Sequence, residues 1–511
     1  MPDCKGGLAH AYLTCAFLSA YCFSFEKYRE HMAYNSLQDF VQVLEREGEL
    51  RRVTHPVKAE LEITEIADRV MKNNGPALLF ENVAGKQIPV LINAFGSPKR
   101  MALALGVGDI EEIASAVQKL VQTKPPKSFS DKLQLLAELV KLAGIPPKIV
   151  STGDCQQIVH REPDLGILPV LTCWPGDAGP FITLPMVFSK DPVKGTRNVG
   201  LYRMQVFDSR TTGMHWHLHK VGARHYQHQK EQSGRMELAV CLGGDPAMIY
   251  AATAPLPDQI DEVLFTGFLR KKGVRLVKGV TVDVEVPANS DIVIEGYVDP
   301  AEPLRREGPF GDHTGFYSLA DDYPVFHVTC ITQKEQPIYP TTIVGRPPME
   351  DAYMGKATER IFLPLLRLTF PEIIDMNLPV HGVFHNLAII SIKKEYPAHA
   401  RKIMHALWGM GQMMFTKILV VVDHDVDVHD LSEVTWVAGN HIDPQRDTVI
   451  VEGPVDVLDH AAPVLGYGSK IGIDATRKWR SEGFEREWPN VIVMDEKTKI
   501  YIDSIWEKLG I

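Results

Sequence analysis

The feature that most constrains how this chain can fold is a change of pattern along its length. From residue 32 to about 145, amphipathic helical patterns alternate with short apolar strands, and the alternation returns after about 338. Between these regions the strand patterns are short and rich in turns and glycines. Alternating helices and strands predict α/β domains, whereas many short strands predict a β-barrel or a curled sheet. We therefore expect a multidomain α/β protein with domains at 32–149, 150–336 and 337–511.

Individual elements can be placed within each region. Ser36 is a helix N-cap candidate, and Gly48 would end the helix that follows it. Helices are also expected at 63–71, 109–122 and 130–143, with strands at 77–80 and 90–92. The middle region predicts strands at 181–188, 199–207, 237–242, 274–278, 291–297 and 325–332, and a helix at 258–269. The C-terminal region predicts helices at 356–368 and 398–414, and strands at 387–392, 418–422 and 449–451.

Composition excludes several classes of protein. Of the 511 residues, 45% are hydrophobic and 23% are charged, which excludes a mainly disordered or fibrous chain. The net charge of −10, from 54 basic and 64 acidic residues, argues against non-specific nucleic-acid binding. The seven cysteines form no CxxC pair and no zinc-type spacing with histidines, so we expect no disulfide framework and no structural zinc. The sequence thus favours a reducing, cytoplasmic compartment.

Residues 1–31 read differently from the rest of the chain. Residues 8–25 are nearly uncharged, but only Lys5 precedes them as a basic residue and no small-residue cleavage site follows. We interpret residues 1–31 as an N-terminal extension, and a targeting or membrane segment and a docked helix remain as alternatives. No other apolar run reaches about 18 residues.

The segment at 198–205 contains an arginine within an apolar strand pattern. On a strand, Arg203 would face the opposite way from Tyr202, with Asn198 near the start. A buried, unpaired guanidinium is costly, so Arg203 needs an anion. A phosphate, a substrate carboxylate and a structural Asp or Glu all suit its geometry.

A second segment, at 214–220, is rich in histidine. His215, His217 and His219 alternate, so on a strand they would share one face. Imidazole nitrogens bind metals, although a solvated histidine-rich strand would show the same pattern. His225 and His228 follow on an expected helix.

A third segment, EGPFGDHTG at 307–315, carries two acids. Glu307 and Asp312 would face opposite ways on a regular strand, but the Gly-Pro and Gly between them can turn both carboxylates into one pocket. Two carboxylates that approach each other repel, so one tends to hold a proton near neutral pH, as a general acid must. The alternative is a turn in which Asp312 caps backbone amides.

Two further residues are weaker candidates. Glu262 lies beside the apolar stripe of the expected helix 258–269, where a glutamate is usually solvated rather than a ligand. Lys417 precedes the expected strand 418–422 and would be either a phosphate ligand or a strand-edge charge.

Taken together, these segments resemble the UbiD family of decarboxylases that use prenylated FMN. The resemblance covers essentially all of residues 32–511. The motifs that carry it are LEITEIAD (61–68), GPALLFEN (75–82), LTCWPGD (171–177), NVGLYR (198–203), EGPFGDHTG (307–315), GRPP (345–348) and GSKIGID (468–474). The family fold has an N-terminal α/β domain, a central split β-barrel that binds flavin and a C-terminal α/β domain used in oligomerisation.

The resemblance also implies a cofactor and the residues that bind it. In the family a divalent metal, usually manganese, holds the flavin phosphate, with a monovalent cation such as K+ nearby. Asn198 and Glu262 match metal ligands, and His219 matches the metal histidine with an ambiguity of two residues towards His215 or His217. The cofactor-binding positions implied are Asn198, Leu201, Tyr202, Arg203, Trp216, His219, Lys220 and Lys417. A flavin prenyltransferase would supply the cofactor.

The resemblance assigns the reacting face to three residues. Arg203, Glu307 and Asp312 match the family's Arg–acid–acid network. Arg203 would orient the substrate carboxylate and keep Glu307 ionised, and either acid could return the proton to the carbon that loses CO2. The family match favours Asp312 as the donor.

The function implied is decarboxylation of an aromatic acid. The first candidate substrate is 4-hydroxy-3-polyprenylbenzoate, in ubiquinone biosynthesis, which would also imply association with a membrane surface. Other hydroxybenzoates, cinnamate-like acids and a menaquinone route are alternatives. A conventional FMN oxidoreductase on a split barrel is an alternative of another class, as is a non-catalytic assembly protein. We expect a dimer or a hexamer of identical chains.

Overall fold

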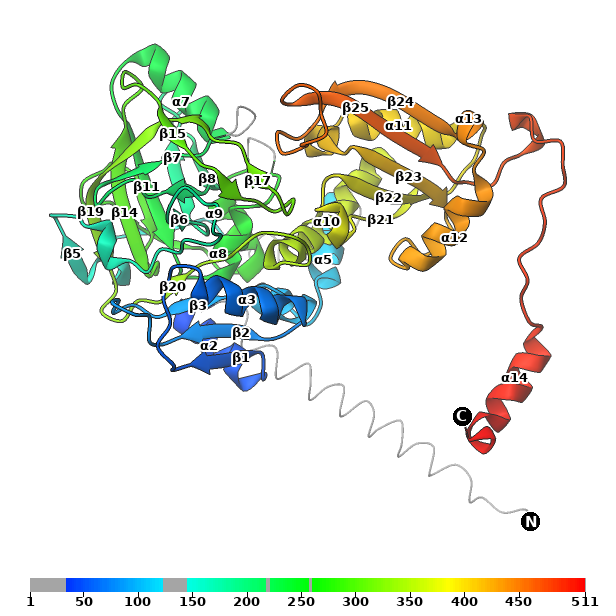
Figure 1. Ribbon diagram of the computed structural model, residues 1–511, viewed down its shortest axis with the longest axis horizontal. Helices are drawn as coiled ribbons and strands as arrows, with labels where there is room; N and C mark the ends of the chain where they lie inside the picture. The colour runs from blue at the N-terminus through cyan, green and yellow to red at the C-terminus, as the bar shows by residue number, and fades with distance from the viewer. Residues whose placement is uncertain (1–33, 123–144, 217–220, 257–259, 511) are drawn as a thin grey trace, which may run out of the picture.

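The computed structural model describes residues 34–122, 145–216, 221–256 and 260–510. Figure 1 shows an N-terminal sheet below a strand-rich central region, and a separate C-terminal α/β region joined to them through helix α10. The predicted extension 1–31, the predicted helix 130–143 and residues 217–220 lie outside the described residues. The fold is a mixed α/β fold of several domains, as the sequence predicts.

The N-terminal region is built on a four-stranded sheet in the order β1-β2-β3-β20. Its strands are β1 (Leu50–Val53), β2 (Ala77–Phe80), β3 (Val90–Ile92) and β20 (Tyr339–Pro340), and its helices are α2 (Leu37–Arg46), α3 (Glu62–Lys72), α4 (Pro98–Ala104) and α5 (Glu111–Gln122). The predicted cap is confirmed, because the Asp39 N–H donates to Ser36 Oγ at 3.1 Å. β20 joins this sheet from far along the chain, so the domain limits at 149 and 336 stay a prediction.

The central region contains a seven-stranded antiparallel sheet in the order β10-β19-β14-β11-β7-β8, with β5 also paired to β19. These strands are β5 (Ile158–His160), β7 (Met186–Lys190), β8 (Arg197–Leu201), β10 (Thr211–Gly213), β11 (Met236–Leu242), β14 (Ile292–Val298) and β19 (Val325–Gln333). Helices α7 (Val221–Gln232), α8 (Pro246–Ala251) and α9 (Glu262–Arg270) accompany them. The described strands do not close into a barrel.

Smaller sheets complete the central region. They are formed by β4 (Lys148–Val150), β6 (Phe181–Ile182), β9 (Met204–Gln205), β12 (Arg275–Lys278), β13 (Glu285–Pro287), β15 (Arg305–Glu307), β16 (Phe310–Gly311), β17 (Tyr317–Ser318) and β18 (Asp321–Tyr323). The single strand predicted at 199–207 is therefore wrong. The chain leaves the large sheet after β8 and enters a two-stranded sheet, in which β9 pairs with β6. Tyr202 and Arg203 lie at this break.

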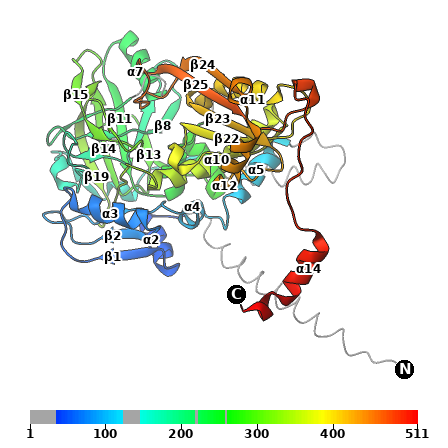
Figure 2. The same cartoon turned by 45° about the vertical axis from the view of Figure 1, so that its right-hand side comes forward.

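The C-terminal region has a five-stranded sheet in the order β21-β22-β23-β25-β24. The strands are β21 (Ile373–Asn377), β22 (Leu387–Ile392), β23 (Ile418–Asp423), β24 (Thr448–Pro454) and β25 (Tyr467–Asp474), and the helices are α10 (Glu350–Thr369), α11 (His399–Trp408), α12 (Leu431–His441), α13 (Pro444–Asp447) and α14 (Glu496–Ile505). The helix predicted at 398–414 ends early, at Gly409. Beyond the sheet, α14 stands away from the body of the molecule in both ribbon views (Figures 1 and 2).

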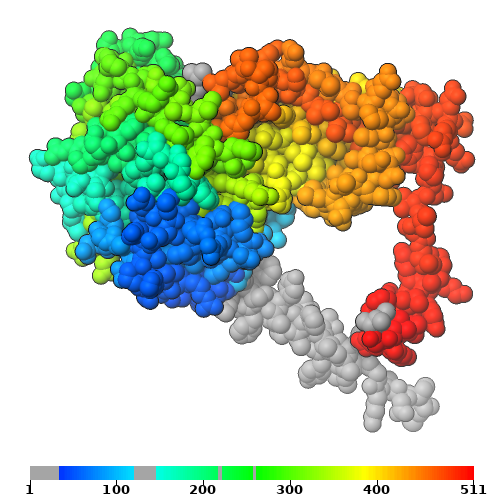
Figure 3. All heavy atoms as spheres, in the orientation of Figure 1, coloured from blue at the N-terminus to red at the C-terminus, as the bar shows by residue number. Residues whose placement is uncertain are grey.

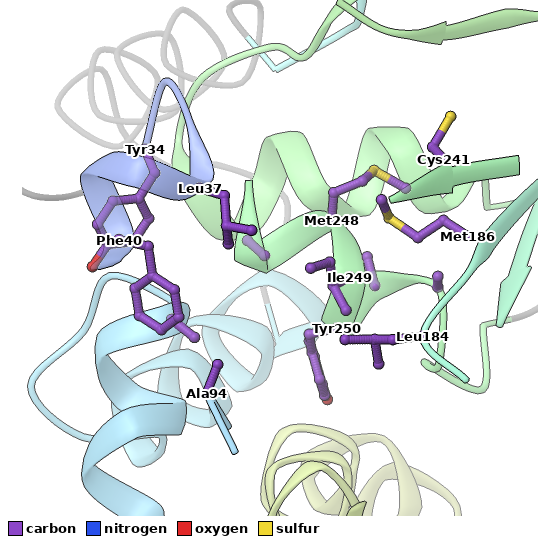
Figure 4. Close-up of a cluster of buried hydrophobic side chains, with 14 of the residues drawn as sticks. Tyr34, Leu37, Phe40, Ala94, Leu184, Met186, Cys241, Met248, Ile249 and Tyr250 are labelled. Atoms are coloured by element: carbon purple, nitrogen blue, oxygen red, sulfur yellow. The ribbon is translucent and has the colours of Figure 1, made fainter. Parts of the chain in front are cut away.

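A shared hydrophobic core joins the first two regions. Leu37 and Phe40 of α2 belong to the same buried cluster as Met248 and Tyr250 of α8. Figure 4 shows these side chains filling the space between the N-terminal and central elements. Burying aromatic and long aliphatic side chains is the main stabilising term in such an interface. The central region, which carries the candidate site, is thus supported by the N-terminal region.

Among the described residues, no helix combines the length and the apolar character needed to cross a bilayer.

Candidate functional site

The centre of the candidate site is the guanidinium of Arg203. Its Nε donates to Glu307 Oε1 at 3.1 Å, one Nη donates to Asp312 Oδ2, and the other donates to Ser318 Oγ at 3.1 Å. The exposed fraction of the side chain is 11% for Arg203, 0% for Glu307 and 7% for Asp312. The structure therefore brings together the three residues predicted for the reacting face.

The glycine-containing loop between the two acids brings them to one guanidinium. Glu307 ends β15 and Asp312 follows β16. Between them Gly308 has φ +87°, a left-handed conformation that glycine adopts at little cost. The Gly308 N–H donates to Gln205 Oε1 at 2.8 Å, and the Gly311 N–H donates to Asp177 Oδ1 at 2.7 Å. The predicted turn is confirmed, and Asp177 is an anchor that the sequence did not single out.

The structure does not give Asp312 the raised pKa that an acid holding a proton needs. Although burial acts to raise it, the pKa of Asp312 is held well below its usual range by the hydrogen bond from His313 and the charge of Arg203. Each acid contacts its own guanidinium nitrogen, so their repulsion is offset. Asp312 is therefore ionised in this structure and must acquire a proton before it can act as a general acid.

His215 supports Glu307 from the other side. Its Nδ1 lies 3.0 Å from Glu307 Oε1, its ring centroid lies 4.2 Å from that of Tyr323, and burial lowers its pKa. The other Glu307 oxygen is buried and has no hydrogen-bond partner among the described residues. His215 does not lie on a strand but in an irregular stretch after β10. His217, His219 and Lys220 lie outside the described residues.

Asn198 lies in β8, and Glu262 contacts the next residue of that strand. Glu262 is the first residue of α9, and its Oε2 accepts the Val199 N–H at 3.0 Å. Burial raises the pKa of Glu262 to about 7. The amide nitrogen of Asn198 is buried and makes no hydrogen bond within ordinary distance and angle limits to the described residues. The described residues contain no cluster of three His, Cys, Asp or Glu side chains around one metal position. An amide oxygen and a partly buried carboxylate nevertheless fit two ligands of a hard divalent cation.

The other predicted cofactor-binding residues are spread over several elements. The Leu201 N–H donates to the Ala252 carbonyl at 3.1 Å, and the Tyr202 hydroxyl accepts the Gly222 N–H at 3.4 Å. The Trp216 ring is edge-on to Tyr202, and its buried Nε1 has no hydrogen-bond partner among the described residues. The indole N–H of Trp216 is therefore suited to donate a hydrogen bond to a polar group of a ligand.

Lys417 lies apart from these residues, directly before β23 in the C-terminal region. Its Nζ donates to Asp459 Oδ1 at 2.7 Å. His460, which follows Asp459 in the chain, approaches the segment 307–315 that carries the two acids, with its Nε2 3.1 Å from Thr314 Oγ1. Lys417 therefore belongs to a loop system that touches the site, but no contact within the described residues joins it to Arg203, Glu307 or Asp312.

A pair of histidines next to Asp312 was not predicted. His313 Nδ1 lies 2.9 Å from Asp312 Oδ1, and His313 Nε2 lies 2.8 Å from His385 Nε2. His313 could have been found from its position beside Asp312 in the sequence. His385 could not, because 72 residues separate it from His313 and no motif links the two.

Comparison with known proteins agrees with this geometry. The 3-octaprenyl-4-hydroxybenzoate carboxy-lyase (UbiD) models match with their N-terminal domain at residues 41–120, their Rift-related domain at 148–347 and their C-terminal domain at 352–475. A protein of uncharacterised function from Archaeoglobus fulgidus is 52% identical over 480 residues, covering 94% of this chain and 99% of the relative. The chain belongs to the UbiD family and is a carboxy-lyase.

Solved structures of the family match over nearly the whole chain. The vanillic acid decarboxylase of Sedimentibacter hydroxybenzoicus is 28% identical in its closed form, with a TM-score of 0.80 over 93% of this chain and 99% of that one. Its open form gives 0.75 over 94% and 99%. HmfF of Pelotomaculum thermopropionicum, in complex with FMN, is 30% identical, with a TM-score of 0.75 over 89% and 97%. An evolved dimeric form of HmfF, in complex with prenylated FMN, gives 0.73 over the same shares.

Proposed function

We propose that this protein removes CO2 from an aromatic acid of the hydroxybenzoate type, using prenylated FMN. The observation that carries the proposal is the buried guanidinium of Arg203 held between Glu307 and Asp312. When bound, prenylated FMN supplies the electron sink for the carbon that loses CO2. The first candidate substrate is 4-hydroxy-3-polyprenylbenzoate. Another hydroxybenzoate, a cinnamate-like acid and a menaquinone route are the alternatives.

The residues of the chain divide the remaining work. Arg203 orients the substrate carboxylate, and Asp312 returns one proton to carbon once it has gained one. Glu307 holds Arg203 in place through the 3.1 Å hydrogen bond. Asn198, Glu262 and His219 hold a divalent metal such as Mn2+, with K+ nearby, and Leu201, Tyr202, Trp216, Lys220 and Lys417 contact the flavin. The supporting observations are the partly buried carboxylate with a raised pKa at Glu262 and the unused donor of Trp216.

The test begins with the protein purified anaerobically from cells that also express a flavin prenyltransferase. Native mass spectrometry should show a mass increment for prenylated FMN plus a divalent metal. The same sample should release CO2 from one or more aromatic acids, with prenylated hydroxybenzoates screened first. Asp312→Asn should keep the cofactor and lose most turnover, by about 10²-fold or more. Plain FMN with hydride transfer from NAD(P)H and no CO2 release would favour the oxidoreductase instead.

We also propose that two or more copies assemble through the C-terminal arm, defined here as residues 489–510. Trp488 still packs on His441, with ring centroids 4.9 Å apart. Beyond it, Ile492 is 99% exposed and Ile500 is 66% exposed. Figure 3 shows this arm standing off from the rest of the molecule. An extended arm with exposed apolar side chains is stabilised when it covers another surface, and a second copy of the chain is the occupant we infer.

Light scattering on the full chain and on a chain lacking residues 489–511 tests this assembly. The full chain should be a dimer or hexamer, and the shortened chain should dissociate to a smaller species. Ile492→Asp is the milder variant, and Lys497→Glu, which changes charge on the arm without removing apolar surface, is its control. An unchanged oligomer in the shortened chain would contradict the role of the arm.

The proposed location is the cytoplasm, at a membrane surface if the substrate carries a polyprenyl tail.

A further inference from the structure

The contact between His313 and His385 joins two regions of the molecule at the candidate acid. His313 follows Asp312 in the central region, whereas His385 lies between η3 (Val380–Gly382) and β22 in the C-terminal region. Their Nε2 atoms are 2.8 Å apart, a distance at which one nitrogen must donate and the other accept. One proton therefore lies between the two rings.

The other nitrogen of His313 is also a donor. Its Nδ1 lies 2.9 Å from Asp312 Oδ1, and an ionised carboxylate can only accept. The Asp312 carboxylate is ionised because Arg203 and His313 both contact it. Nδ1 must then carry a proton. The remaining question is which ring owns the proton between the two Nε2 atoms.

The surrounding charges favour His313 as the ring that carries the proton between the two Nε2 atoms. Asp312 contacts it, and the charges of Asp351, in the first turn of α10, and of Asp456, in the segment after β24, also act on it. Despite its burial these acids raise the pKa of His313. Burial and the charge of His313 lower the pKa of His385 to about 4, so His385 is the neutral acceptor. His313 is thus an imidazolium with both nitrogens bonded.

We propose that His313 is the proton store for Asp312, and that His385 keeps His313 charged by accepting from its Nε2. The proposal deepens the decarboxylase function above and rests on it. Both histidines act through Asp312 rather than on the substrate, so they are positioning residues. They explain how an acid that is ionised beside an arginine can still deliver a proton.

The proton balance is simple. The substrate carboxylate leaves as neutral CO2 when the carbon–carbon bond breaks, and its electron pair takes up one proton. That proton moves from His313 Nδ1 to an Asp312 oxygen and from there to carbon. His313 is left neutral, with its remaining proton on Nε2 facing His385. After product release, one proton from solvent restores the imidazolium.

The store is complete only when the C-terminal region contacts the central region. Phe384, next to His385, stacks on the His313 ring, with the two ring centroids 5.1 Å apart. Val383 and Phe384 both have φ +47°, a costly conformation for such residues that holds this segment in one shape. The chain is also more similar to the closed than to the open vanillic acid decarboxylase, with TM-scores of 0.80 and 0.75. Separation of the two regions would move His385 away from His313, and His313 would then lose its positive charge.

The first experiment needs no cofactor. In protein carrying ring-¹⁵N histidine, one imidazolium signal should persist at pH 8 and vanish in His313→Gln. In His385→Phe the His313 imidazolium should lose its proton at a pH at least about one unit lower than in the wild type. In His385→Gln, which retains an acceptor oxygen, this pH should lie between those of the wild type and His385→Phe. The exposed His424→Gln is the matched control. A neutral His313 at pH 7 in the wild type would overturn the proposal.

The second experiment uses the holoenzyme. In His385→Phe the alkaline limb of the kcat profile should move to lower pH, with about a tenfold loss at pH 8, little loss at pH 6 and an unchanged KM. A uniform loss at every pH in both His385 variants would indicate a structural role and overturn the proposal. A wild-type holoenzyme that releases no CO2 from any aromatic acid would instead overturn the proposed function, whatever the ¹⁵N spectra show.

Discussion

Two carboxylates of the central region, the buried Asp312 and the partly buried Glu262, have opposite pKa shifts. Asp312 contacts the guanidinium of Arg203 and the imidazole of His313, and its pKa is lowered. Glu262 accepts the Val199 N–H, and burial raises its pKa to about 7. The nearby Arg197 does not pair with Glu262, because it is bound to Asp261 and Glu285.

The difference shows where the fold supplies its own cations. A carboxylate removed from water is costly unless a positive charge or several donors replace the lost solvent. At Asp312 the chain supplies that charge itself, so the acid is ionised and fixed in place. At Glu262 burial outweighs the charge of Arg197, which is bound to Asp261 and Glu285, so the pKa of this carboxyl rises. The opposite pKa shifts of Asp312 and Glu262 therefore follow from the charges that contact each carboxylate.

The largest effect is expected from removing the cation that the chain supplies. Arg203→Lys replaces three directed donors with a single ammonium, so one of the two acids loses its partner. CO2 release should fall on the order of 10³-fold, whereas metal content should not change. Turnover and metal analysis on the same sample measure both. Arg210→Lys, in an exposed ion pair with Glu162, is the control. A tenfold loss or less would mean that the geometry of the guanidinium is not essential.

The next effect concerns the acid that lacks a cation. In the proposed metal site the ion would bind the ionised form of Glu262, so Mn2+ affinity should weaken about tenfold for each pH unit below about 7. Glu262→Gln should bind Mn2+ about 10²-fold more weakly at pH 8 and lose this pH dependence. Titration calorimetry between pH 5.5 and 8.5 measures both, with the exposed Glu60→Gln as control. An unaltered affinity in Glu262→Gln would remove this residue from the metal site.

The same acid has a consequence for metal-free protein. The folded-state pKa of Glu262 lies above the usual value of 4.5, so its proton stabilises the fold at low pH and that contribution is lost as pH rises through about 7. Glu262→Gln should therefore be more stable than the wild type at pH 8, by about 3 kcal/mol at most, and similar to it at pH 5. Added Mn2+ should reverse the order at pH 8. Denaturant unfolding at both pH values tests this.

The smallest effect is expected at Lys417. A charge-assisted hydrogen bond to a flavin phosphate would first require Lys417 to leave Asp459, which offsets most of the gain. Lys417→Met should weaken flavin binding only about fivefold, and Asp459→Asn should strengthen it by a similar factor. Fluorescence titration with FMN measures both. Equal flavin affinity in the two variants would place Lys417 outside the cofactor site.

Much of the fold follows from local patterns in the sequence. Ser36 caps its helix, and the all-apolar strand at 77–80 is buried, because capping and burial depend on residues within a few positions. The strand predicted across Tyr202 and Arg203 failed, since the break there is imposed by pairing with β6, a partner that local periodicity does not reveal.

The sequence by itself determined the family, the α/β and strand-rich regions, and the residues Arg203, Glu307 and Asp312, because their types and order within motifs carry that information. Only the tertiary structure decided that both acids bind one guanidinium and that the pKa of Asp312 is lowered. Only the tertiary structure brought His385 to His313 and β20 to the N-terminal sheet. These contacts depend on how distant segments pack, and a pKa depends on the charges and burial that this packing creates.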